Sequence, residues 1–202
     1  MPNSKRDGAA RLGCRLERLL VVASVLAVAC STLPATSQSQ ARAPAPDCVV
    51  EGNANTASQN AQVVSTLRQA VERGPLYEIA SRSGVASCRI GQDSDAIRLE
   101  YVFRDGTTLR ATRNLQIEYS DQELRLATPL AESPVPMLTR AERAAFGEKG
   151  CGIDWKRPDS KPAADNGTIT ETVYRGDTCN CQARARADAT GRVLTMSLRS
   201  AC

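Results

Sequence analysis

Hydrophobic and polar residues alternate from Ile97 to Phe103, which is the pattern of a strand with one buried face. A three-residue loop over 104–106 keeps the same face buried in the next strand and puts Gly106 where the turn needs a positive φ. This loop predicts a hairpin with the pairs Phe103–Thr107, Tyr101–Leu109 and Leu99–Ala111, and it sets Glu100 against Arg110 on the other face. The chain is then expected to continue extended through Leu115, Ile117 and Tyr119.

A second hairpin is predicted over Cys179 to Cys202, after a strand from Ile169 to Arg175. A four-residue loop, Asp188 to Gly191, predicts the pairs Ala185–Leu194, Ala183–Met196 and Cys181–Leu198. Cys151 to Trp155 is a further candidate strand, and 157–166 is expected to be a polar loop. Asn166-Gly167-Thr168 fits a glycosylation sequon, but a turn is the interpretation we favour.

Apolar residues at helical spacing precede each of these two sheet regions. Apolar residues recur at a helical period from Thr56 to Arg73, with Thr56 or Ser58 as the cap and Gly74-Pro75 as the end. A short helical turn over 75–81 follows. In the second half, Thr139 and Glu142 fit a capping box that opens a helix to Phe146, which Gly147 ends.

These elements predict an α+β fold of two small halves, each a helix packed on an antiparallel sheet. The halves cover 48–127 and 137–202, and the proline-containing segment 128–136 connects them. Each half also holds a Cys-x-Ile sequence (Cys88 and Cys151) and a Glu-x-Val-aromatic-Arg-x-x-Thr sequence (100–107 and 171–178). A tandem duplication explains these repeats, and chance similarity is the alternative. One objection is that the alanine face of the second hairpin is expected to pair with Val173 rather than Tyr174.

If the halves are duplicates, the layout resembles that of tandem helix-and-sheet inhibitor proteins, the family of the β-lactamase inhibitory protein. The resemblance is one of architecture only, because the sequence holds no motif of that family. It does not imply an activity, because one fold hosts many functions.

The N-terminus has the parts of a secretory signal peptide. A basic region from Ser4 to Arg18 precedes twelve apolar residues, 19–30, which are too few for a membrane span. Residues 1–41 are therefore taken as the signal peptide and the start of a tether, and 42–47 as flexible tether. Cleavage after Ser37 or Ala41 gives a periplasmic or secreted protein. Ala27 to Cys30 resembles a lipobox, so lipidation of Cys30 is the alternative and the only expected link to a membrane.

Six of the eight cysteines fall in the mature chain, which in an exported protein predicts three disulfides. Self-contained halves give Cys48–Cys88 and leave Cys151, Cys179, Cys181 and Cys202 to pair among themselves. Residues 179 and 181 face the same side of a strand, so flanking disulfides are favoured over a redox or metal role for this pair. We expect no metal and no cofactor.

The absence of histidine removes the Ser-His-Asp triad, the Cys-His pair and histidine-ligated metal sites. A pair of carboxylates, Asp154 beside Trp155 and Glu171, is the remaining candidate for catalysis, as in glycan hydrolysis. The formal charge of +4 comes mostly from the leader. The first 41 residues hold five basic and two acidic residues, which leaves 21 basic and 20 acidic residues in the rest. Charge therefore does not indicate a nucleic-acid partner.

Four arginines are the candidate binding residues: Arg175, Arg184, Arg186 and Arg199. Arg184, Arg186 and Arg199 are expected on the hairpin face opposite the cysteines, where guanidinium groups can pair with an anionic partner. A solvated strand face with charges at its rim is the alternative. The sequence thus favours an exported, non-enzymatic binding or inhibitory protein for an envelope protein or cell-wall component. A carboxylate-dependent hydrolase and a redox or metal protein are the other hypotheses.

Overall fold

The computed structural model describes residues 47–51, 60–92, 95–117, 119–148, 150–163 and 166–201. These residues belong to one unit, Ala43–Cys202. The signal peptide, Cys30, most of the tether, the expected cap at Thr56 or Ser58, and Cys202 lie outside them.

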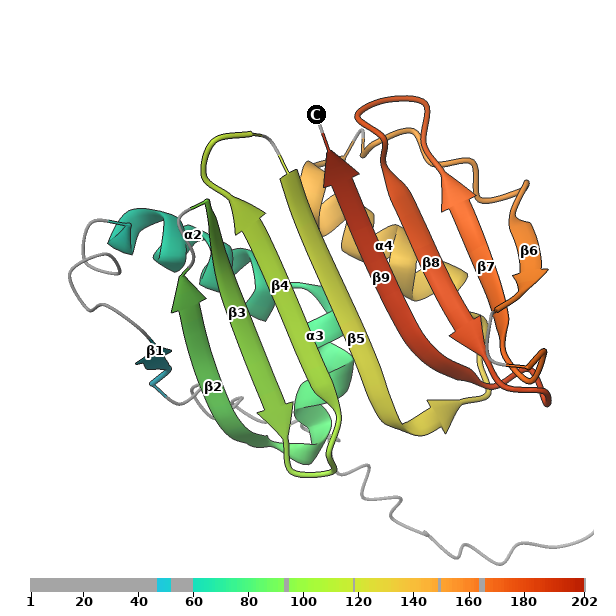
Figure 1. Ribbon diagram of the computed structural model, residues 1–202, viewed down its shortest axis with the longest axis horizontal. Helices are drawn as coiled ribbons and strands as arrows, with labels where there is room; N and C mark the ends of the chain where they lie inside the picture. Colours follow the sequence, from blue (N-terminus) through green and yellow to red (C-terminus); the bar gives the residue numbers. More distant parts are fainter. Residues whose placement is uncertain are drawn as a thin grey trace, which may run out of the picture. The chain divides into compact units, whose positions relative to one another are not determined.

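One sheet of nine strands runs through the described residues, in the order β1-β2-β3-β4-β5-β9-β8-β7-β6 (Figure 1). Its strands are β1 (Val49–Glu51), β2 (Val85–Gln92), β3 (Ala96–Phe103), β4 (Thr108–Asn114), β5 (Tyr119–Leu130), β6 (Asp159–Pro162), β7 (Thr170–Arg175), β8 (Gln182–Ala187) and β9 (Val193–Ala201). β1 pairs with β2 in parallel, and the other neighbours are antiparallel.

The helices lie together on one face of this sheet (Figure 1). They are α2 (Ala61–Glu72), α3 (Pro75–Ala80), the 3-10 turn η1 (Ser81–Ser83) and α4 (Val135–Phe146). The core fills the space between the two layers. At its centre Leu109, Leu124 and Met196 follow one another across β4, β5 and β9, and none of the three has any exposed surface. None of the described helices has the length and apolar composition that a membrane crossing requires.

The structure confirms the mixed α+β class, but the halves share one sheet instead of forming two. β5 ends the first half and β9 ends the second, and these two strands pair in register from Tyr119↔Ala201 to Arg125↔Thr195. The fold by itself does not establish a tandem duplication. The objection drawn from the second hairpin was nevertheless wrong, because Ala183 pairs with Tyr174 while Val173 faces Arg184.

The first hairpin has the predicted register. Tyr101 pairs with Leu109, Leu99 with Ala111 and Glu100 with Arg110. The Phe103 N–H donates to the Thr107 carbonyl at 2.9 Å, and Gly106 has a φ of 88°. After Asn114 the chain bends instead of continuing extended, because the Asn114 side chain accepts the backbone N–H groups of Gln116 and Ile117.

The predicted register of the second hairpin was wrong by two residues. Ala185 pairs with Met196 and Ala183 with Leu198, not with Leu194 and Met196. The loop is a three-residue one, like that of the first hairpin, because the Asp188 N–H donates to the Arg192 carbonyl and Gly191 has a φ of 81°. The register then shifts between Ala187↔Val193 and Arg186↔Thr195, so that Leu194 is a bulge.

Four further details of the elements differ from expectation. α4 begins at Val135 after Pro134, and Thr139 is inside it, where its hydroxyl donates to the Val135 carbonyl instead of capping. β5 extends to Leu130, into the expected connector. β6 forms within the expected loop, whereas the candidate strand 151–155 makes only a bridge from Ile153 to Gly176. The end of α4 at Phe146 and the turn at Asn166 and Gly167 are as predicted.

Two disulfides join described cysteines. Cys48–Cys88 ties β1 to β2, as predicted, and Cys151–Cys181 ties the segment after α4 to the start of β8. Cys179 is disulfide-bonded as well. Disulfides persist in oxidising compartments, so these bonds are compatible with export.

Candidate functional site

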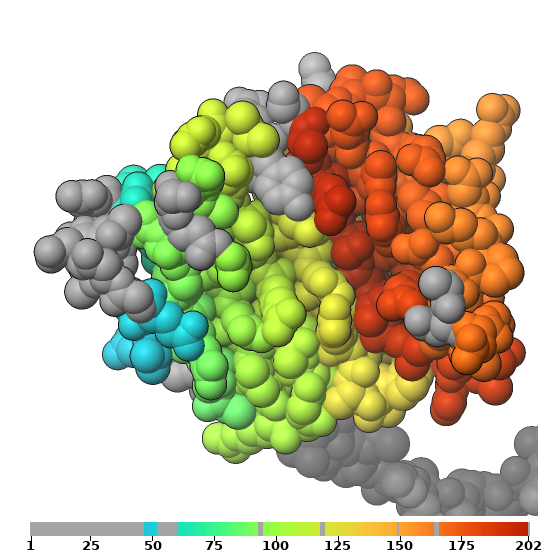
Figure 2. Space-filling view, in the orientation of Figure 1, coloured from blue at the N-terminus to red at the C-terminus, as the bar shows by residue number. Residues whose placement is uncertain are grey.

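The face of the sheet on which none of the described helices lies is called the open face here, and Figure 2 looks directly at it. Three rows of cross-strand neighbours define it. The middle row runs across eight strands: Arg89, Glu100, Arg110, Glu123, Ser197, Arg184, Val173 and Asp159. One flanking row includes Arg98, Thr112, Asp121, Arg199, Gln182 and Arg175, and the other includes Arg125, Thr195, Arg186, Glu171 and Lys161.

All four arginines predicted as binding residues lie on the open face. Arg199 and Arg175 are separated only by Gln182, and Arg184 and Arg186 follow Gln182 along β8. Cys181, which precedes Gln182, is buried on the other face. Their placement therefore follows the expected alternation along the strand, while a binding role for them stays a prediction.

Ion pairs link neighbouring strands across this face. Glu100 and Arg110 approach to 2.9 Å, Asp121 and Arg199 to 3.3 Å, and Asp159 and Arg175 to 3.2 Å. All three of these arginine side chains are more than two-fifths exposed, so each single pair contributes little to stability. Their main effect is to hold long side chains in fixed positions on a rigid sheet.

Two hollows open on this face. One lies over β3 and β4, has a volume of about 230 Å³ and is lined by Arg98, Glu100, Arg110 and Thr112 among others. The other lies over the β6–β8 edge, has a volume of about 460 Å³ and is lined by Lys161, Glu171 and Arg186 with Pro162 and Ala163. Both therefore present guanidinium groups beside a carboxylate.

Sequence reasoning missed half of this surface. Arg89, Arg98, Arg110 and Arg125 extend the arginine set onto the strands of the first half. The signal was present for Arg98 and Arg110, which fall on the polar side of the predicted first hairpin. What could not be read from the chain was the β5–β9 pairing, which makes the two polar faces one continuous surface.

The structure does not bring Asp154 and Glu171 together. Asp154 lies beside the end of β7, where its N–H donates to the Arg175 carbonyl. Glu171 lies four residues before Arg175 on that strand, which is about 13 Å along the backbone at a rise of about 3.3 Å per residue. Each carboxylate has its own cations, Arg157 for Asp154, and Lys161 and Arg184 for Glu171. Glycosidase carboxyl groups are about 5–9.5 Å apart.

Trp155, next to Asp154, is partly buried and packs on Tyr174 with ring centroids 5.2 Å apart. Burial raises the pKa of the Tyr174 hydroxyl. This aromatic pair therefore fills the end of the core under β7, on the opposite side of the sheet from the open face.

Cys179 and Cys181 are both disulfide-bonded. No group of three or more Cys, Asp or Glu side chains in the described ranges is arranged to hold a metal ion. A redox or metal role for this pair stays a hypothesis.

Comparison with known proteins gives no relative for this chain: no family model, no curated protein and no solved structure matches it.

Proposed function

We propose that this protein is an exported, non-enzymatic binding or inhibitory protein that engages a partner through the open face. The observation that carries the proposal is a face of eight strands on which no described helix lies, and on which arginines and carboxylates alternate across β2 to β5 and Arg184 and Asp159 follow on β8 and β6. Disulfides close both halves of the scaffold. A rigid surface loses little conformational entropy when it binds.

A protein partner is favoured over a wall polyanion. The middle row alternates in sign over β2 to β5, with Arg89, Glu100, Arg110 and Glu123 in succession. A polyanion is attracted by a uniformly basic surface, whereas a protein surface offers both signs in a matching pattern. The excess of arginine over acid on the second half calls for an acidic patch on the partner.

A photo-crosslinker at Ser197 tests this proposal. Ser197 is the neutral position between Glu123 and Arg184 in the middle row, so a benzoylphenylalanine there reaches whatever covers the face. Ser65, exposed on α2, is the matched control on the other side of the molecule. We expect a protein adduct from Ser197 alone in cells that export the protein.

Charge reversal provides the second arm. Arg184→Glu with Arg199→Glu is expected to abolish the Ser197 adduct, while Arg143→Glu on the exposed side of α4 leaves it unchanged. Equal adducts from Ser65 and Ser197, or no adduct from either, would contradict the proposal. Glycan adducts at Ser197 would show that the partner is a wall component and not a protein.

The proposal includes export and the way in which the N-terminus is processed. We propose cleavage after Ser37 or Ala41, with lipidation of Cys30 as the alternative. The intact mass of the natively exported protein separates these forms, because only lipidation adds acyl chains and leaves Cys30 as the first residue.

We also propose that the two halves arose by duplication. The first half has α2 and α3 before β2 to β5, and the second has α4 before β6 to β9. Consecutive strands within each set of four pair antiparallel. In the repeated sequence, Val102 and Val173 both lie on the open face, and Phe103 and Tyr174 both lie in the core. Equivalent residues of the repeat thus lie on the same face of the sheet in both halves. This supports the duplication in addition to the sequence match.

A further inference from the structure

A row of polar residues interrupts the core face of the sheet near one end. Arg113, Ser120 and Ser200 are consecutive cross-strand neighbours on β4, β5 and β9. They continue the side of the sheet that is apolar two rows further in, where Leu109, Leu124 and Met196 are neighbours. Polar groups therefore face the helix layer here, at a position where core residues are expected.

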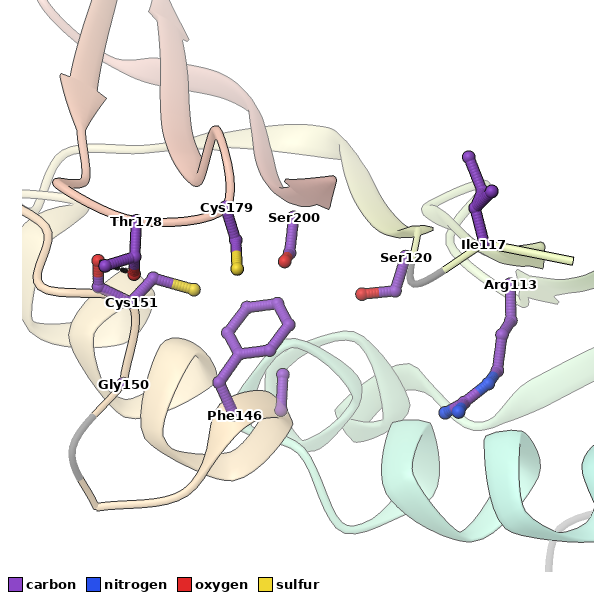
Figure 3. Close-up of a pocket in the computed structure, with 10 residues that line it drawn as sticks. Arg113, Ile117, Ser120, Phe146, Gly150, Cys151, Thr178, Cys179 and Ser200 are labelled. Atoms are coloured by element: carbon purple, nitrogen blue, oxygen red, sulfur yellow. Dashed lines mark hydrogen bonds between the residues drawn. The ribbon is translucent and has the colours of Figure 1, made fainter. Parts of the chain in front are cut away.

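A cavity of about 280 Å³ lies over this row. Ala145 and Phe146, the last residues of α4, form its apolar side, and the sulfur-bearing residues Cys151 and Cys179 close one end. Figure 3 shows the Phe146 ring in the middle of this space, with the hydroxyls of Ser200 and Ser120 directed into it and the Arg113 guanidinium at the far end. Ile117, 59% exposed, lies at the rim.

None of the three polar side chains has a partner among the described residues. Arg113, Ser120 and Ser200 make no side-chain hydrogen bond or ion pair there. Ser200 is nevertheless only 6% exposed. On the open face, by contrast, arginines such as Arg110 and Arg199 are paired with carboxylates. The cavity thus presents one cation and two hydroxyls that no described side chain binds.

The two ends of the cavity differ in charge. The C-terminal carbonyl groups of α4 give the Phe146 end a partial negative charge. Arg113 gives the other end a full positive charge. A bound molecule is therefore oriented, with its anionic group at Arg113 and its apolar part against Phe146 and the cysteine sulfurs, which contact aromatic rings favourably.

We propose that this cavity binds a small carboxylate with an aromatic or compact apolar body. A cavity of about 150 Å³ holds a benzene molecule, so the volume here accommodates a phenyl ring with a short carboxylate chain. The guanidinium and the two hydroxyls would receive the carboxylate. This site lies on the other side of the sheet from the open face and does not depend on the function proposed for that face.

Backbone amide NMR of the mature, disulfide-intact protein tests the proposal with 3-phenylpropionate as the probe. We expect saturable shifts at Ser120, Phe146, Thr178 and Ser200. The alcohol 3-phenyl-1-propanol has the same body without the charge, and we expect it to bind at least 10-fold more weakly. Acetyl-glycyl-phenylalanine as a third probe tells whether the carboxylate belongs to a free small acid or to a peptide C-terminus.

Arg113→Met is the decisive variant, because Arg113 is exposed and its loss leaves the core intact. A hydrogen bond to a charged group is worth about 1.5–3 kcal/mol, so affinity for 3-phenylpropionate should fall about 10- to 100-fold. Affinity for the alcohol should stay the same, and Arg82→Met at an exposed position of η1 should change neither. Equal binding of acid and alcohol, an unaffected Arg113→Met protein, or no shifts at these residues overturns the proposal.

Discussion

Asp188 holds the turn between β8 and β9 through four hydrogen bonds. Its carboxylate accepts the hydroxyl and the N–H of Thr190, and the N–H and the guanidinium of Arg192, at 2.6–3.2 Å. The Thr190 hydroxyl, the two backbone N–H groups and the Arg192 side chain together lower the pKa of Asp188 to about 2. The turn is thus stabilised by the charged form of this side chain.

The predicted pH dependence follows from the direction of that shift. The unfolded-state pKa of an aspartate is about 3.9, so the stabilisation by Asp188 is complete above about pH 4 and is lost as the pH falls through about 2. Wild type should be more stable than Asp188→Asn at pH 5, and the difference should disappear near pH 2. Carboxyl ¹³C NMR measures the pKa directly, and a value near 3.9 would contradict the prediction.

Tyr101 has no exposed surface and donates its hydroxyl proton to Glu72 at 2.6 Å, while Arg68 donates to the same oxygen at 2.7 Å. Burial raises the pKa of Tyr101 well above its usual range, and the hydrogen bond to Glu72 raises it further. We expect Tyr101→Phe to lower the free energy of unfolding by about 1–3 kcal/mol, because a carboxylate loses a buried donor. Glu72→Gln keeps an acceptor oxygen and should cost less. Urea unfolding of both variants checks this, and an equal or larger cost for Glu72→Gln would contradict it.

The two hairpins show what could be predicted from sequence at the scale of residues. At the first, Tyr101 and Leu109 are large and apolar, so one register buries both and exposes Arg110. At the second, Ala183, Ala185 and Ala187 are small and pair acceptably in several registers, so apolar pattern did not decide among them. The register is determined by the backbone hydrogen bond of Asp188 and by the bulge at Leu194. Neither feature can be recognised from the alternation of apolar and polar residues in the sequence.

At the scale of elements, Gly176 allows the segment after α4 to approach the end of β7. A Cβ at Gly176 would lie 2.6 Å from the Cys151 carbonyl oxygen and 3.0 Å from the Cys181 Cβ. The same segment forms the Cys151–Cys181 disulfide and receives Glu142, 4% exposed, which accepts the Cys151 N–H at 2.7 Å. Position 176, where α4, β7 and β8 meet, therefore has no room for a side chain, and only glycine fits there.

Gly176→Ala is expected to destabilise the protein by about 1–3 kcal/mol, because backbone atoms must move to admit the methyl group. Gly91→Ala on β2 is the control, since a Cβ there meets nothing within 4 Å. Its effect should stay within about 0.5 kcal/mol. Thermal unfolding of both oxidised variants measures the difference, and equal melting temperatures would contradict the close contact.

Prediction of the strands from sequence identified the arginines of the open face but not the residues of the cavity under Arg113. The open face follows from strand alternation, which places Arg184 and Arg186 opposite Cys181. Arg113 also obeys the alternation, but on the apolar side of β4, where it appears in sequence as an ordinary strand end. Its significance depends on Ser120 and Ser200, which only the pairing of β5 with β9 brings beside it.

At the scale of the whole molecule, the β5–β9 pair determines whether the halves are independent. Leu124 of β5 and Met196 of β9 are neighbours with no exposed surface, and they belong to different halves. A core that crosses the boundary in this way links the stability of the two halves. We therefore expect one cooperative unfolding transition instead of two.

Leu124→Ala tests this coupling, because it truncates a side chain of the first half while Trp155, the only tryptophan, reports on the second. Removing a buried leucine side chain costs about 2–5 kcal/mol. The denaturant midpoint followed by Trp155 fluorescence should fall as far as the midpoint followed by far-ultraviolet circular dichroism, whereas exposed Ser65→Ala should move neither. A fluorescence midpoint that stays in place while the dichroism midpoint falls would mean that the second half folds alone. The open face would then extend over two domains that unfold separately. In that case a partner bound to both domains, and not the shared sheet, would link their stabilities.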